Sequence, residues 1–135
     1  MTMANHGHFS SLDADECQQL LRGSSVGRVA WDAGAAGLLV LPVNYVWADG
    51  QILFRTAPHT ALAQLAEGRS VAFQVDFYDV EALNGWSVLG QGNSRLFSED
   101  KPSLVPYPWA PGPRHLVIAI SLRQLSGRAV SANDR

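Results

Sequence analysis

The sequence is short of cysteine, lysine and long apolar runs, and each shortage excludes a class of protein. Cys17 is the single cysteine among 135 residues, which excludes an internal disulfide and a zinc site built from several cysteines. Lys101 is the single lysine and lies in a polar stretch, which argues against Schiff-base chemistry. No apolar run approaches the roughly 20 residues of a membrane span, and the first residues have no signal-peptide pattern. We therefore expect a cytoplasmic protein without a membrane partner.

The net charge is also small. Ten basic residues against twelve acidic residues give a net charge of −2. Because binding to nucleic acid needs a surplus of cations, we expect no nucleic-acid partner. The hydrophobic share of 47% is typical of a folded chain, and the length fits one domain. We expect a mobile tail over residues 1–10 and a single domain over residues 11–135. His6 and His8 fall in this tail, and we expect no metal site.

Two short helices are predicted. Asp13 can cap the first helix while Glu16 reaches back to the cap. Cys17 then begins an apolar stripe at helical spacing, so we interpret Cys17 as a buried packing residue rather than a reactive thiol. The second helix is expected over residues 59–67, where Gly68 can end it.

The remaining chain is typical of strands joined by tight turns. Apolar residues alternate with polar residues in several segments, which turn residues separate. Pro42 interrupts one segment and indicates an edge strand or a bulge, because proline cannot donate a ladder hydrogen bond. Chains of this kind close into a small mainly β barrel. The expected strands cover residues 25–31, 38–47, 51–56, 70–78, 86–97 and 115–122, with a further short strand at 127–130.

Residues that suit an anion gather after the strand at 51–56. Arg55 and Thr56 end this strand, and His59 and Thr60 open the helix that follows. A guanidinium, two hydroxyls and backbone N–H groups at a helix N-terminus favour a negatively charged group. An ordinary helix cap by Thr56 or Thr60 explains the same residues equally well.

Large flat side chains accompany these anion-binding candidates. Trp86 and Trp109 lie beside turn residues, and Arg114 follows Trp109. A phosphorylated ring cofactor would require such flat surfaces near a cation.

Residues 85–89 lack the last glycine of a nucleophile elbow, and residues 90–95 lack the third glycine of a dinucleotide fingerprint. We therefore name no catalytic residue.

Six motifs follow one another along the chain: Pro42-Val43-Asn44-Tyr45, Ile52-Leu53-Phe54-Arg55-Thr56, Val71-Ala72-Phe73-Gln74-Val75-Asp76, Gly85-Trp86-Ser87-Val88, Pro108-Trp109-Ala110-Pro111-Gly112 and Ser126-Gly127-Arg128. In this order they resemble the pyridoxamine 5′-phosphate oxidase-like family of FMN-binding split barrels. The resemblance is closest to the small nitroimidazole-reductase-like branch, and it covers the chain from about Leu12 to Val130.

The resemblance implies a six-stranded antiparallel split β-barrel of the Greek-key type with two short helices. It also implies a homodimer with two flavins in clefts at the dimer interface. Residues 55–60 would approach the FMN phosphate and ribityl chain, and the late loop would reach in from the partner subunit. The residues that it places around the cofactor are Pro42, Asn44, Arg55, Thr56, His59, Thr60, Trp86, Ser87, Trp109 and Arg114.

The implied activity is that of an FMN-dependent oxidoreductase acting on a small-molecule substrate, in which the flavin itself transfers hydride or electrons. One position departs from the family pattern, because family members commonly have Lys or Arg about where Ala61 stands. FAD, a deazaflavin coenzyme and haem therefore stay open as alternative cofactors. Storage or sensing of such a ligand without turnover stays open as an alternative function.

Overall fold

The structure, a computed structural model, describes residues 8–98, 105 and 116–132. Within them the chain forms β-strands, one α-helix and two short 3-10 helices. In chain order these elements are β1 (His8–Leu12), α1 (Ala14–Gly23), β2 (Val26–Asp32), η1 (Gly34–Ala36), β3 (Leu38–Asn44), β4 (Val46–Ala48), β5 (Gln51–Thr56), η2 (Ala61–Glu67), β6 (Ser70–Asp79), β7 (Asn84–Leu96) and β8 (Leu116–Ser131).

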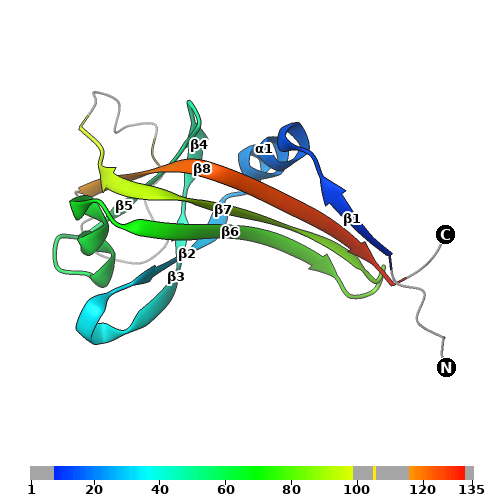
Figure 1. Ribbon diagram of the computed structural model, residues 1–135, viewed down its shortest axis with the longest axis horizontal. Helices are drawn as coiled ribbons and strands as arrows, with labels where there is room; N and C mark the ends of the chain where they lie inside the picture. The colour runs from blue at the N-terminus through cyan, green and yellow to red at the C-terminus, as the bar shows by residue number, and fades with distance from the viewer. Residues whose placement is uncertain (1–7, 99–104, 106–115, 133–135) are drawn as a thin grey trace.

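The strands form one antiparallel sheet that curls back on itself (Figure 1). Hydrogen-bonded neighbours follow the order β3-β2-β6-β7-β8-β5-β4, and β1 pairs with β8 off this path. β3 and β4 lie at opposite ends of this order, yet only Tyr45 separates them in sequence. The two ends of the sheet therefore meet at a junction, here termed the seam, where β3 passes into β4 beside β5. When β3 and β4 are counted as one bent strand, the curled sheet has the six strands that were predicted, and β1 is an addition.

Two segments are divided into strands differently from the sequence prediction. The strand expected over 38–47 is broken at Tyr45 and not at Pro42. Pro42 is tolerated inside β3 because this strand is at the edge of the sheet, as predicted, and pairs on one side only, with Arg28 of β2 opposite Pro42. The segments expected at 115–122 and 127–130 form one continuous strand, β8, because β7 pairs along its length with a single register shift at Gln91/Gly92.

Residues 8–10, which we expected in a mobile tail, belong to β1. Phe9 pairs with Val130 of β8, and Leu12 pairs with Gly127. The pairing arises because β8 extends beyond β5 and offers a free edge. β1 is almost wholly exposed, so its sequence has no alternation of apolar and polar residues from which a strand could be predicted.

α1 begins with the predicted capping box. The Asp13 carboxylate accepts a hydrogen bond from the Glu16 N–H at 2.8 Å, and the Glu16 carboxylate accepts one from the Asp13 N–H at 2.9 Å. Cys17 is fully buried against Gly127 of β8, where an added Cβ would come within 2.7 Å of the Cys17 sulfur. Burial raises the pKa of the Cys17 thiol, and the nearby Asp13 and Glu16 carboxylates raise it further. These contacts confirm that Cys17 is a packing residue.

The second predicted helix is present as η2, a 3-10 helix that begins at Ala61 rather than at residue 59. Gly68 ends it in the left-handed conformation, with φ of 80°. Leu65 is fully buried in the main core, and the Trp31 indole N–H donates to the Gln64 amide oxygen at 3.0 Å. η2 therefore covers one end of the curled sheet.

Tyr45 fastens the bend between β3 and β4 to α1. Its hydroxyl donates to the Leu21 carbonyl at 2.6 Å, and its ring packs edge-on against Phe73 with the ring centroids 5.0 Å apart. The side chain is 3% exposed, and burial raises the pKa of Tyr45 to about 12. The buried Tyr45 side chain thus fixes the position of the bend at the seam, next to Asn44.

Beyond the barrel, β6, β7 and β8 continue as an arm with β1 alongside β8 (Figure 1). β2 pairs with β6 only over residues 72–74, whereas the β6–β7 ladder continues to Asp79 and Asn84. Phe77 and Tyr78, which are neighbours on β6, therefore point to opposite faces of the arm. They are 57% and 55% exposed, respectively.

Candidate cofactor site

Three of the predicted site residues lie on the outer face at the seam. Pro42 and Asn44 alternate with buried residues on β3, so their side chains point outward. Arg55 shares the outer face of β5 with Leu53, which belongs to a small apolar cluster outside the barrel. The β4–β5 register pairs Val46 with Leu53, and β3 also contacts β5. Asn44 and Arg55 therefore share the outer face near the seam.

The Arg55 guanidinium is held in place beside the seam. Its side chain is 9% exposed, and its Nε–H donates to the Val105 carbonyl at 2.9 Å. A cation that is mostly removed from water attracts an anion more strongly than an exposed one, because water and salt screen it less. Arg55 is therefore the group at the seam that is best suited to a phosphate.

Thr56 points to the other face of β5, toward Thr60. The two hydroxyl oxygens lie 2.6 Å apart, and the Thr60 hydroxyl donates to the Ala57 carbonyl at 2.9 Å. Thr60 then accepts the proton of Thr56, so both hydroxyl protons are already engaged. His59 is exposed on the preceding turn. The sequence grouped these residues with Arg55 in one niche, whereas the structure sets the hydroxyls and the guanidinium on opposite faces of β5.

Ala61 is exposed at the first position of η2. Thr60, the residue before Ala61, makes no side-chain cap hydrogen bond to η2. The first turn of η2 has no acidic residue. The start of η2 therefore has backbone N–H groups but no cation, which agrees with the departure seen at Ala61 in the sequence.

A second group of polar residues lines a groove of about 380 Å³ on the outer face of the sheet. Ser87 of β7 is its predicted site residue, and Arg128 of β8 is the cross-strand partner of Ser87. The Arg128 Cζ lies 4.6 Å from the centroid of the Phe9 ring, a cation–π contact that orients the guanidinium. This groove, here termed the Arg128 groove, is lined by Phe9, Ser11, Gln74, Ser87, Leu89, Ser126, Gly127 and Arg128.

An ion pair stands next to the Arg128 groove. The Arg28 guanidinium lies 3.2 Å from the Asp76 carboxylate, and Asp76 is the cross-strand partner of Ser87. The two side chains are 51% and 24% exposed, so the pair contributes little to stability. It does offset the negative charge of Asp76, which leaves Arg128 as the charge that an incoming anion meets in this groove.

The remaining predicted residues lie elsewhere. Trp86 packs against the main core on the inner side of β7, so the structure separates it from its neighbour Ser87. Trp109 and Arg114 lie outside the described residues. Sequence reasoning missed Arg128 and Gln74 as site candidates. The signal that could have found Arg128 is the Ser126-Gly127-Arg128 motif together with strand alternation, which sets it on the same face as Ser87.

The chemistry of these side chains fits a phosphorylated planar cofactor. The two guanidinium groups suit phosphate oxygens, and the Asn44 amide and the Ser87 hydroxyl can donate and accept hydrogen bonds at the polar edge of a ring. Among the residues that the structure describes, no three His, Cys, Asp or Glu side chains gather as metal ligands. In the same part of the chain, no helix is long and apolar enough to span a membrane.

The sequence matches the family of pyridoxamine 5′-phosphate oxidases over residues 13–129. The chain belongs to this family. The match includes the seam and, apart from Phe9 and Ser11 of β1, the residues of the Arg128 groove. It confirms the resemblance that the six motifs indicated. A search of the curated proteins found no match.

Solved structures place this pyridoxamine 5′-phosphate oxidase family member among chains of similar length. The FAD binding protein from Mycobacterium smegmatis is 28% identical, with a TM-score of 0.71 over 90% of this chain and 98% of that one. A conserved protein of unknown function from Corynebacterium diphtheriae is 30% identical, with a TM-score of 0.70 over 90% and 97% of the two chains. A FAD-binding protein from Mesorhizobium loti is 23% identical, with a TM-score of 0.74 over 93% and 98%, and shares the fold.

Proposed function

We propose that the protein is a cytoplasmic, homodimeric flavoprotein that binds FMN, alone or as part of a larger nucleotide, and passes hydride or electrons to a small-molecule substrate. The observation that carries this proposal is the pair of oriented guanidinium groups on one outer face of the family fold, Arg55 at the seam and Arg128 in its groove. Family membership and the 28% identity to a FAD binding protein support it.

When bound, the flavin supplies the hydride and electron transfer itself. The protein residues bind and orient it. Arg55 would hold a phosphate at the seam, and Asn44 beside it would hydrogen-bond the edge of the ring system. Ser87 and Arg128 would contribute hydrogen bonds from the groove. The two residues with raised pKa values, Cys17 and Tyr45, are packing residues of the core and have no part in this site.

The positions of the two half-sites support a homodimer. Pro42 at the seam and Ser126 in the Arg128 groove share the outer face but lie four strand spacings apart, roughly 19 Å along the sheet. A two-fold axis across this face would set the seam of one subunit against the groove of the other. The row of cross-strand partners between them is Pro42, Arg28, Gln74, Leu89 and Ser126.

Exposed apolar side chains on the same outer face also support a second copy. Side chains of this kind gather on soluble proteins where a partner covers them. On β2, β3 and β7 they are Val26 at 39%, Leu38 at 82%, Val40 at 60% and Leu89 at 37% exposed.

Titration with FMN tests the binding step. We expect flavin fluorescence to be quenched with a stoichiometry of one flavin per chain. Arg128→Gln should weaken binding by about tenfold or more, since a hydrogen bond to a charged group contributes about 1.5–3 kcal/mol. Arg123→Gln removes the same charge from an exposed position of β8 outside the groove and should leave affinity unchanged. If neither FMN nor FAD binds at high micromolar concentration, the proposal is wrong.

Binding without turnover is the second candidate function, and the M. smegmatis relative, known as a FAD binding protein, favours it. An anaerobic experiment separates the two. A reductase should lose the yellow absorbance of its bound flavin on addition of NADH or NADPH and regain it with an electron acceptor. Bleaching by dithionite alone would assign the protein to storage or sensing.

A further inference from the structure

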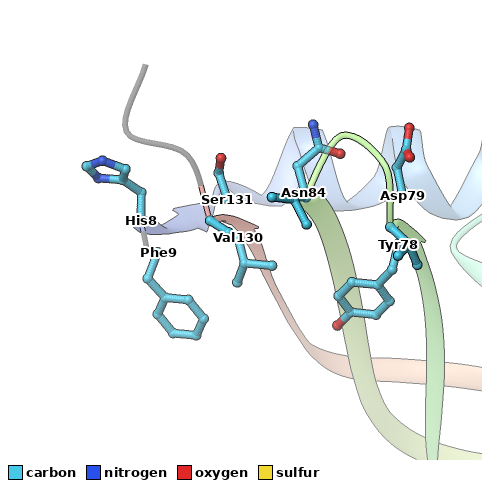
Figure 2. A pocket seen from close by; sticks show the side chains of 10 residues that line it. His8, Phe9, Tyr78, Asp79, Asn84, Val130 and Ser131 are labelled. Atoms are coloured by element: carbon cyan, nitrogen blue, oxygen red, sulfur yellow. The ribbon is translucent and has the colours of Figure 1, made fainter. Parts of the chain in front are cut away.

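The arm has an apolar groove of about 490 Å³ next to the Arg128 groove. Its floor is formed by Phe9, Val130 and Tyr78. These residues belong to one row of cross-strand partners across β1, β8, β7 and β6, in which Gly85 lies beneath Tyr78. Figure 2 shows the side chains of Phe9, Val130 and Tyr78 pointing to the same side of the sheet. A Cβ at Gly85 would collide with the Tyr78 ring, so the glycine lets this ring lie flat over the strand. The floor is therefore flat and apolar, with the Phe9 ring at one side and the Tyr78 ring at the other.

The hairpin turn between β6 and β7 forms the rim of this groove and is held rigidly. The Asp79 carboxylate accepts hydrogen bonds from the N–H groups of Glu81 and Ala82, both at 3.0 Å. Leu83 has a φ of 58°, a strained conformation for a leucine, and its carbonyl accepts the Ala132 N–H at 2.8 Å. These bonds fix a turn whose apolar side chains face solvent, since Leu83 is 49% exposed.

The apolar floor and the Arg128 groove share one residue. Phe9 lines both grooves, and its ring is the surface on which the Arg128 guanidinium rests. The row that contains Arg128 and Ser87 lies two residues further along the strands, a distance of roughly 7 Å. A flat apolar floor beside a guanidinium and hydroxyls matches a nucleotide, because a base stacks on aromatic rings and its phosphates bind the cation.

We propose that this floor binds adenine and that the phosphates of the same nucleotide lie at Arg128. The ligand is then an adenine dinucleotide. Its adenine comes either from FAD, in which case the inference rests on the proposed flavin function, or from NADH or NADPH. Tyr78 is the specificity-determining residue, because it forms the side of the floor farthest from Arg128.

Substitution of Tyr78 tests the proposal. Tyr78→Val removes the ring and keeps a residue that favours strands. We expect it to weaken FAD binding about tenfold or more and to leave FMN affinity within about twofold, as base stacking accounts for about 1–3 kcal/mol. Phe77→Val is the matched control, because Phe77 is the neighbouring exposed aromatic residue on the opposite face of β6. It should change neither affinity.

Two further titrations distinguish the source of the adenine and separate this inference from the flavin proposal. ADP carries the adenine and phosphates without a flavin, and its affinity should fall in Tyr78→Val whether or not any flavin binds. If FAD and FMN bind the wild type equally, but NADH binding to the FMN-loaded protein falls about tenfold in Tyr78→Val, the adenine belongs to the nicotinamide nucleotide. If Tyr78→Val leaves the affinities for FAD, NADH and ADP unchanged, or the wild type binds none of them, the adenine site does not exist.

Discussion

Replacing Tyr45 by phenylalanine should weaken the fold at neutral pH and change how stability depends on alkaline pH. The hydroxyl of Tyr45 donates to the Leu21 carbonyl in the last turn of α1 at 2.6 Å. Tyr45→Phe leaves that carbonyl without this donor in a buried place. Loss of such a partner costs about 1–2 kcal/mol of unfolding free energy. Because Tyr45 also anchors the bend next to Asn44, the variant should loosen the seam.

The alkaline effect follows from the raised pKa of Tyr45, which moves from its ordinary value of 10 to about 12 as a result of burial. Between these values the unfolded chain has lost the phenolic proton while the folded chain still holds it. The unfolded state therefore binds fewer protons, and stability falls as pH rises, by about 1.4 kcal/mol per pH unit. This contribution is fully present below pH 10 and lost by about pH 12, and the phenylalanine variant lacks it.

The two effects oppose each other, so the stability curves should cross. With a cost of about 1.5 kcal/mol at neutral pH and a slope of about 1.4 kcal/mol per unit above pH 10, the crossing is expected near pH 11. Urea unfolding of the wild type and Tyr45→Phe between pH 7 and pH 11.5 measures it. Tyr78→Phe is the control, because Tyr78 is 55% exposed, and its curve should follow the wild type. Parallel curves for the wild type and Tyr45→Phe would refute the reasoning.

Three other perturbations test separate parts of the molecule. Ala61→Lys should tighten FMN binding about tenfold, equivalent to about 1.4 kcal/mol, because it adds a cation to the first turn of η2. Arg55→Ala should weaken FMN binding. A titration in which neither variant changes the affinity would put the phosphate elsewhere. Gly127→Ala should destabilise the fold by about 1–3 kcal/mol, because its Cβ would press on the Cys17 sulfur at 2.7 Å. Adding Cys17→Ala should recover part of that loss in urea unfolding, and no recovery would contradict the packing argument. Val40→Asp should convert the dimer to a monomer in light scattering without changing the circular dichroism spectrum, and a wild type that is already monomeric at micromolar concentration would refute the shared site.

The elements that local chemistry determines could be predicted from the sequence. The capping pair Asp13 and Glu16 marks the start of α1 by hydrogen bonds within one turn, so no distant contact is needed to find it. Alternation over residues 70–78 likewise marks β6. β1 was missed because its pairing depends on the free edge of β8, which the residues of β1 do not encode. The break at Tyr45 was missed for a similar reason, since the bend arises from its buried bond to α1.

The candidate site could be predicted only in part, because sequence neighbours need not share a face. Arg55 and Thr56 are adjacent in sequence, yet strand alternation sends them to opposite sides of β5. Asn44 and Arg55 are distant in sequence, yet both lie on the outer face at the seam, where β3 contacts β5. Arg128 was not chosen as a site residue because its partner Ser87 is known only once β7 and β8 are paired. Family motifs indicated candidate strands, and the face on which each side chain lies is known only from the structure.

The central position of β8 has a consequence for the synthesis of the protein. β8 is the last strand of the described chain, yet β7, β5 and β1 all pair with it. The hairpins β2–β3 and β6–β7 join neighbouring segments and can form as the chain leaves the ribosome, because local contacts form quickly. The barrel cannot close until residues 116–121 of β8 have emerged, because these residues pair with both β5 and β7. The edges of β5 and β7 stay open until then. Nascent chains with open strand edges are prone to aggregate, and a chaperone that covers such edges would act on this protein before its last strand is made.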